Sequence, residues 1–202
     1  MKKKIAILGS TGSIGKTLLK IINNDKKKFE IKLLAARKNY IYLLKQATKF
    51  KVKNLIITNY DSYIKLKSKT KNTDIKVFNN FDELSTIFNK KIDYVMSSIT
   101  GFDGLIPTLK IIKFTKKIAI ANKEAIICGW RLIEKELKYY KTNFIPVDSE
   151  HFSLWYGLKN IENYKIERIY LTASGGPLLN TDISKFKNIK LSQALKHPSW
   201  KM

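Results

Sequence analysis

The chain has 202 residues, of which 44% are apolar and 27% charged, and no apolar run approaches the roughly 18 residues that a membrane-spanning helix needs. Its single cysteine, Cys128, excludes an internal disulfide and a multi-cysteine metal cluster, and it favours the reducing cytosol. The formal charge of +23 comes from lysines spread along the whole chain with only three arginines, a pattern that argues against a nucleic-acid partner and is compatible with a phosphate-bearing substrate. Without a membrane-spanning run, no membrane partner is expected either.

Short apolar runs alternate with segments of helical spacing along residues 1–147. Apolar runs that stop abruptly are typical of buried parallel strands. The expected strands cover residues 4–8, 29–35, 54–57, 75–78, 92–97, 117–120 and 144–147. The expected helices cover residues 17–22, 40–50, 81–88, 105–114 and 122–140. This alternation predicts an α/β fold, a Rossmann-like doubly wound parallel sheet.

The pattern changes after about residue 150. Residues 166–172 (IERIYLT) alternate like a half-exposed strand, and a short helix is expected near residues 191–195. We therefore expect one domain over residues 1–147, followed by the start of a second, α+β domain over residues 148–202.

A glycine-rich segment, GSTGSIG, links the first expected strand to the first expected helix. In that context Gly9 permits a tight turn, Gly12 lets the backbone approach a pyrophosphate, and Gly15 allows close packing of helix and strand. The helix N-terminus then offers free N–H groups to the phosphates. The segment predicts a dinucleotide site; the alternative is a turn that serves packing alone.

The residues after the second strand indicate which dinucleotide is bound. An NAD enzyme commonly has an acidic residue there, but this chain has Arg37 and Lys38, which would pair with a 2′-phosphate. NADP is therefore favoured over NAD. The competing interpretation is that two basic residues mean little in a chain so rich in lysine.

Two carboxylates, Asp148 and Glu150, follow the last expected strand. If the backbone is extended there, both side chains point to the same side, where they would suit Mg²⁺ or Mn²⁺. A helix cap formed by Asp148 or Ser149 explains the same pattern equally well. His151, next to them, fits an orienting or core position better than a ligand position.

Three further motifs lie in loops or at helix starts. Residues 121–124 (ANKE) begin a helix directly after a strand, where Asn122 and Lys123 can meet an anion or carboxamide, although Asn122 is also suited to capping the helix. Residues 174–177 (SGGP) suit either an anion-binding turn or a plain turn. Residues 197–200 (HPSW) suit a loop that closes over a ligand.

Taken in order, GSTGSIG, ARKN, ANKE, PVDSEH, SGGP and HPSW resemble the 1-deoxy-D-xylulose-5-phosphate reductoisomerase family, over roughly the first half of its usual length. The resemblance implies an enzyme that uses NADPH and Mg²⁺ or Mn²⁺. It would rearrange and reduce 1-deoxy-D-xylulose 5-phosphate to 2-C-methyl-D-erythritol 4-phosphate, in non-mevalonate isoprenoid biosynthesis. A cytoplasmic homodimer is implied for the full-length protein.

The resemblance also implies a role for each matching residue. The residues matched to the cofactor are Thr11, Gly12, Ser13, Ile14, Arg37, Lys38, Asn39, Asn122 and Glu124. The residues matched to the substrate are Lys123, Ser149, Glu150, Ser174 and His197. The expected metal ligands are Asp148 and Glu150, which form the catalytic set with Lys123, while Trp200 matches the aromatic residue of a mobile flap.

The chain departs from the family pattern at two points. Arg37 stands where the family often has glycine, and the segment that carries the family's third acidic metal ligand does not occur within the 202 residues. The alternative function is therefore an inactive NADPH-binding fragment. A semialdehyde dehydrogenase would need a catalytic cysteine in its second half, whereas Cys128 lies in the expected nucleotide domain.

Overall fold

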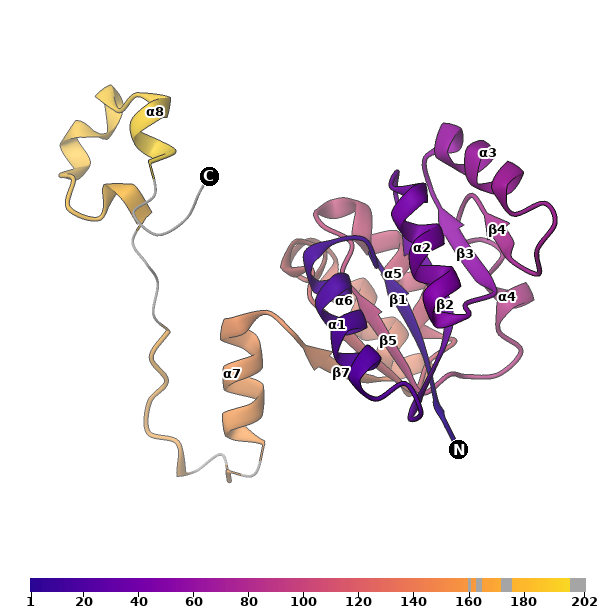
Figure 1. Cartoon of the computed structure of the whole chain (residues 1–202). Coiled ribbons are helices and arrows are strands. Elements are labelled where there is room, and N and C mark those ends of the chain that lie inside the picture. Colours follow the sequence, from indigo (N-terminus) through magenta and orange to yellow (C-terminus); the bar gives the residue numbers. More distant parts are fainter. Residues whose placement is uncertain (160, 163–164, 172–175, 197–202) are drawn as a thin grey trace. The chain divides into compact units, whose positions relative to one another are not determined.

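The computed structural model describes residues 1–159, 161–162, 165–171 and 176–196 (Figure 1). The chain forms two compact units, Met1–Lys159 and Asn160–Met202. The larger unit contains every strand found in the described residues. The predicted boundary between functional domains at residues 147 and 148 stays a prediction.

The larger unit is built on a seven-stranded sheet with the order β4-β3-β2-β1-β5-β6-β7. All neighbouring strands pair in parallel. The strands are β1 (Lys3–Leu8), β2 (Phe29–Ala36), β3 (Asn54–Ile57), β4 (Lys76–Phe78), β5 (Tyr94–Ser97), β6 (Lys117–Ile120) and β7 (Asn143–Pro146). The chain runs outward from β1 to β4 and then returns to place β5 on the other side of β1. The strand order therefore reverses at β1, where open α/β sheets bind their ligands.

Helices cover both faces of this sheet (Figure 1). In the larger unit they are α1 (Ser13–Asn24), α2 (Tyr40–Phe50), α3 (Tyr60–Lys69), α4 (Leu84–Ile87), α5 (Leu105–Ile112), α6 (Lys123–Tyr139) and α7 (Ser149–Leu158), with a 3-10 turn, η1 (Phe102–Gly104), before α5. The smaller unit contains η3 (Gly176–Leu178), η4 (Ile183–Asn188) and α8 (Leu191–Ala194).

Successive residues of a strand point to opposite faces, which divides the apolar core into two clusters. Ala6 and Leu8 of β1 belong to the cluster that includes residues of α5 and α6. Ile5 and Ile7 belong to the cluster that includes residues of α1, α2 and α3. Both clusters are buried, which confirms the expected doubly wound sheet.

The predicted elements agree closely with the structure in this unit. The helix over residues 40–50 and the strands over residues 54–57 and 117–120 have the expected limits. The helix α3 was not predicted, because only Ser62 and Leu66 of its residues are buried and its apolar face is narrow.

The strand expected over residues 166–172 is wrong. Residues 166–171 form neither helix nor strand, and Thr172 lies outside the described residues. Tyr170 and Leu171 are exposed. An alternating segment becomes a strand only when a neighbour pairs with its backbone, and the described residues of the smaller unit contain no strand that does so.

Candidate functional site

The turn after β1 is tight because its glycines have no side chains. Gly9 has a φ of 83°, and a Cβ there would lie 2.6 Å from the carbonyl oxygen of Ser98. A Cβ at Gly15 would lie 2.4 Å from the carbonyl oxygen of Gly9. These two glycines therefore allow α1 and the loop after β5 to approach the turn.

A buried pair of side-chain contacts fixes the turn to α2. The Ser10 hydroxyl donates to Gln46 Oε1 at 2.8 Å, and Gln46 Nε2 donates back to the Ser10 carbonyl oxygen at 2.8 Å. The Gln46 residue is only 6% exposed. Sequence reasoning missed Gln46, because its position in a helix gives no sign of a partner 36 residues away.

The N-terminus of α1 differs from those of α2, α3, α6 and α7. Asn39, Asn59, Asn122 and Asp148 place a side-chain oxygen on the first turn of these four helices. By contrast, Gly12 precedes α1 and no side chain caps it. The first amides of α1 are therefore available to an anion, and the helix dipole favours negative charge there.

A cavity of about 500 Å³ opens beside this turn. The residues that line it include Thr11 and Gly12 after β1, Arg37 after β2, Thr58 after β3 and Asp103 in the η1 turn after β5. The Arg37 side chain is 72% exposed, and its guanidinium forms an ion pair with Asp103 at 3.2 Å. Of the ARKN motif, Ala36 and Arg37 line this cavity, and Arg37 is the one that carries a charge.

The other predicted cofactor residues lie around it in different ways. Ser13 and Ile14 are the first two residues of α1. Asn39 caps α2 by accepting from the Tyr42 amide at 3.1 Å, while Lys38 is exposed. Glu124 is exposed in the first turn of α6.

Asn122 is 4% exposed and uses its whole side chain within the protein. Its Oδ1 accepts from the Ala125 amide at 3.0 Å, which caps α6. Its Nδ2 donates to the carbonyl oxygens of Ile99 and Gly101 at 2.6 and 2.5 Å. The capping interpretation is therefore confirmed, and the same amide holds the loop that lines the cavity.

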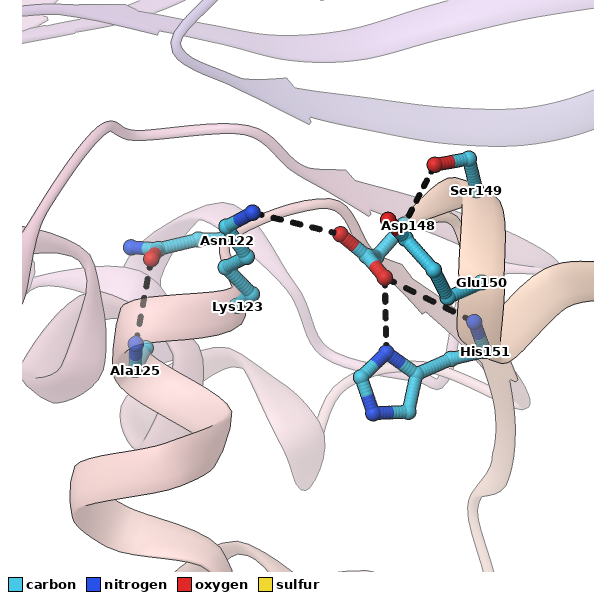
Figure 2. Close-up of polar contacts among 7 residues, drawn as sticks. All are labelled: Asn122, Lys123, Ala125, Asp148, Ser149, Glu150 and His151. Carbon is cyan, nitrogen blue, oxygen red and sulfur yellow. Dashed lines mark hydrogen bonds and ion pairs between the residues drawn. The ribbon is translucent and has the colours of Figure 1, made fainter. Parts of the chain in front are cut away.

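A second group of polar residues gathers at the N-termini of α6 and α7 (Figure 2). Lys123 Nζ lies 3.9 Å from Asp148 Oδ2. Asp148 Oδ1 lies 2.7 Å from His151 Nδ1, and the Ser149 hydroxyl donates to Glu150 Oε2 at 2.7 Å. The Asp148 side chain is 12% exposed, whereas that of Lys123 is 56% exposed.

The extended backbone expected at Asp148 and Glu150 is wrong. The strand β7 ends at Pro146, Asp148 caps α7, and Glu150 lies in its first turn. A helix begins here because the Asp148 carboxylate accepts from the first-turn amide of His151. The capping interpretation of Asp148 is thus confirmed, which leaves its remaining oxygen free to take part in other contacts.

Neighbouring side chains stabilise the ionised form of the Asp148 carboxyl group. A hydrogen bond with the His151 ring lowers the pKa of the Asp148 carboxyl, against a partial burial that raises it. An interaction with the Glu150 side chain lowers that pKa further, so the two acidic side chains are neighbours. His151 is therefore an orienting residue for Asp148, as the sequence favoured.

No group of three or more His, Cys, Asp or Glu side chains that could hold a metal ion occurs in the described part of the chain. The predicted site residues Ser174, His197 and Trp200 lie outside the described residues. No helix among the described residues is long and apolar enough to cross a membrane.

Comparison with known proteins identifies the family. The family model for 1-deoxy-D-xylulose 5-phosphate reductoisomerase matches residues 5–129. The chain belongs to this family. The model for the C-terminal domain of 1-deoxy-D-xylulose 5-phosphate reductoisomerase matches residues 144–202. A 1-deoxy-D-xylulose 5-phosphate reductoisomerase of Pelagibacter ubique (strain HTCC1062) is 61% identical over 202 residues, which are 99% of this chain and 52% of that protein.

Solved structures of the family agree with the fold. The reductoisomerase from Zymomonas mobilis in complex with NADPH matches 98% of this chain and 52% of its own, with a TM-score of 0.85 and 28% identity. A DOX-P reductoisomerase in complex with NADPH, fosmidomycin and magnesium matches 99% of this chain and 52% of its own, with a TM-score of 0.78 and 29% identity. The chain thus spans about half the length of the relatives it matches.

Proposed function

We propose that this chain forms the NADPH-binding part and a share of the metal- and substrate-binding part of a 1-deoxy-D-xylulose-5-phosphate reductoisomerase. The reaction would convert 1-deoxy-D-xylulose 5-phosphate into 2-C-methyl-D-erythritol 4-phosphate. The observation that carries the proposal is that the glycine turn and Arg37 border a single cavity of about 500 Å³. Membership of the family then supports the reaction and its substrate.

The residues around the cavity fit a phosphorylated dinucleotide. The uncapped first turn of α1, with Thr11, Gly12, Ser13 and Ile14, offers backbone amides to the pyrophosphate. Gly12 lines the cavity and has no side chain, so its backbone is approachable. Arg37, with a planar guanidinium that binds phosphate oxygens in pairs, fits the 2′-phosphate, and the neighbouring Lys38 adds positive charge.

Asn39, Asn122 and Glu124 complete the proposed cofactor-binding set. The side chains of Asn39 and Asn122 cap helices in the structure. Asn122 therefore acts by holding the cavity loop, and its contribution to NADPH binding comes from position rather than from a free amide.

Asp148 and Glu150 fit a site for Mg²⁺ or Mn²⁺, because Mg²⁺ is often held by one or two carboxylates together with substrate oxygens and waters. When bound, the cation would polarise the oxygens of the substrate, and NADPH would supply the hydride for the reduction. His151 keeps the Asp148 carboxylate ionised and oriented. The exposed Lys123 side chain beside Asp148 supports a role in binding an anionic substrate. Ser149, Ser174 and His197 stay the other predicted substrate-binding residues.

The alternative, NADPH binding without turnover, is favoured by one observation. The described residues hold two neighbouring carboxylates but no group of three metal-ligating side chains. With only two protein carboxylates, the remaining positions of the cation are filled by waters and substrate oxygens, so the protein alone fixes it less firmly than it would with a third ligand. We therefore expect the 202-residue chain to bind NADPH and to turn over substrate weakly or not at all. The homodimer and the cytosolic location stay predictions for the full-length protein.

The cofactor is tested by titrating NADPH and NADH into the 202-residue chain. NADPH should bind more tightly, and Arg37→Asp should reduce that preference by roughly 1–3 kcal/mol, the scale of a charge-assisted contact. Equal dissociation constants for NADPH and NADH in the unmodified chain would contradict the cofactor assignment.

The metal site is tested by titrating Mn²⁺ into the full-length protein and its Glu150→Gln variant. Loss of a ligand should weaken Mn²⁺ binding by at least about tenfold. Glu124→Gln, which removes the same charge from the first turn of α6, serves as the control and should leave Mn²⁺ affinity unchanged. Equal Mn²⁺ affinity in the wild type and Glu150→Gln would remove Glu150 from the ligand set. NADPH oxidation with 1-deoxy-D-xylulose 5-phosphate and Mn²⁺ then measures turnover.

A further inference from the structure

An acidic residue lies beside the arginine that the proposed function assigns to the 2′-phosphate. Arg37 Nη1 lies 3.2 Å from Asp103 Oδ2. The two residues are 66 positions apart in the sequence and both line the cavity beside the glycine turn. Their side chains are 72% and 67% exposed, so a ligand can reach either of them.

The sheet order explains why these residues meet. β2 and β5 lie on either side of β1, and Arg37 follows β2 while Asp103 follows β5 after a short loop. The ion pair therefore joins the two loops that flank the carboxyl end of β1. It lies across the same strand end that carries the glycine turn.

The loop that carries Asp103 is held in place on both sides of the acid. The buried Asn122 side chain donates to the carbonyl oxygens of Ile99 and Gly101. A Cβ at Gly104 would lie 2.3 Å from Asn122 Nδ2, so the loop is packed directly against this residue. Asp103 is thus a fixed part of the cavity rim, whereas the longer Arg37 side chain can change its partner.

We propose that Asp103 is a specificity-determining residue that competes with the cofactor's 2′-phosphate for Arg37. This inference rests on the proposed NADPH site. A 2′-phosphate that binds Arg37 replaces the Asp103 carboxylate as its partner and brings two negative charges close together. A cofactor with a free 2′-hydroxyl brings no such charge, and acidic residues in dinucleotide sites accept hydrogen bonds from that hydroxyl. Asp103 therefore reduces the preference for NADPH over NADH that Arg37 creates.

The test measures NADPH and NADH dissociation constants for the 202-residue chain by fluorescence titration at one fixed ionic strength, because exposed charges are screened by salt. Asp103→Asn should tighten NADPH binding by about two- to fivefold, the range that exposed ion pairs are worth, and should leave NADH binding equal or weaker. In an Arg37→Gln background, Asp103→Asn should have a clearly smaller effect on NADPH, since the competition needs the arginine.

Asp74→Asn is the matched control. Asp74 forms an exposed ion pair with Lys53 at the same 3.2 Å, but these residues precede β4 and β3 and so lie at the opposite end of the strands. This variant removes the same charge and should leave both dissociation constants unchanged. Circular dichroism of each variant shows that the fold is retained.

The outcomes separate the inference from the proposed function. Weaker or unchanged NADPH binding in Asp103→Asn, with the wild type binding NADPH, contradicts the inference alone. An equal gain in NADPH affinity from Asp103→Asn in the Arg37→Gln background also contradicts it. The gain would then come from lost repulsion between Asp103 and the 2′-phosphate, without competition for Arg37. Failure of the wild type to bind NADPH contradicts the proposed function, and the inference with it.

Discussion

Asn122 is expected to be among the most sensitive polar residues of the larger unit. Its Oδ1 caps α6 and its Nδ2 donates to two carbonyl oxygens of the loop that follows β5. Replacing Asn122 with aspartate keeps the capping oxygen, because aspartate caps helices as well as asparagine does. The same change replaces the donor with a second acceptor, which then faces the carbonyl oxygens of Ile99 and Gly101.

The magnitude follows from these contacts. Loss of the cap alone, as in Asn122→Ala, costs about 1 kcal/mol, and each partly buried carbonyl that loses its donor costs about 1 kcal/mol or more. Asn122→Ala should therefore lower the free energy of unfolding by roughly 2–4 kcal/mol. Asn122→Asp should cost at least as much, because the carboxylate is almost fully buried and repelled by both carbonyl oxygens.

Urea unfolding of the 202-residue chain, followed by far-ultraviolet circular dichroism, measures these changes. Asn59→Asp is the control, since Asn59 caps α3 in the same way. Its Oδ1 accepts hydrogen bonds from the Ser62 amide and the Ser62 hydroxyl, and aspartate keeps this oxygen. It should change the free energy of unfolding by less than about 0.5 kcal/mol. An Asn122→Asp variant as stable as the wild type, beside an alanine variant that loses about 1 kcal/mol, would refute the reasoning and reduce Asn122 to a helix cap.

Three further predictions concern the turn, the acid stability and the extent of the folded unit. Gly12→Ala should fold, because the new Cβ would meet only the Gly9 carbonyl oxygen, at 3.3 Å, but should bind NADPH less tightly, because Gly12 lines the cavity. Gly15→Ala, whose Cβ would meet backbone at 2.4 Å, should lose about 1–3 kcal/mol of stability in thermal unfolding. A hydrogen bond from Lys116, together with the Lys4 amide, lowers the pKa of Asp93, so Asp93 stabilises the fold above the usual aspartate pKa and this contribution is lost as the pH falls through the lowered value. Asp93→Asn should flatten the acid side of the stability profile, and an unchanged profile would contradict the assignment. Residues 1–159 expressed alone should keep amide protection in β1, β2 and β5 and bind NADPH as the whole chain does, which hydrogen exchange and titration measure.

Local patterns were sufficient to predict most of the fold. Most strands of the sheet are short apolar runs that end sharply, because the strands inside the sheet are buried on both faces. The helix over residues 40–50 has a clear apolar face and a capping Asn39. The glycine turn and Arg37 were also predicted from the sequence, because each directly follows an apolar run that predicts a strand. The segment over residues 166–172 shows where prediction from local patterns fails. Its alternation predicts a strand, but a strand forms only when a neighbouring strand pairs with its backbone.

The sequence by itself determined the type of most elements in residues 1–147, α3 excepted, and the chemistry of the motifs between them, since both depend on neighbours along the chain. The tertiary structure decided which distant residues meet. Gln46 holds the glycine turn from 36 residues away, and Asp103 pairs with Arg37 across the end of β1. The structure also decided that α7 begins at Ser149, so that Asp148 and Glu150 are neighbours in a helix turn rather than along a strand. Arg37 and Asp103 meet because of the order of the strands in the sheet, and this order cannot be read from the spacing of residues along the chain.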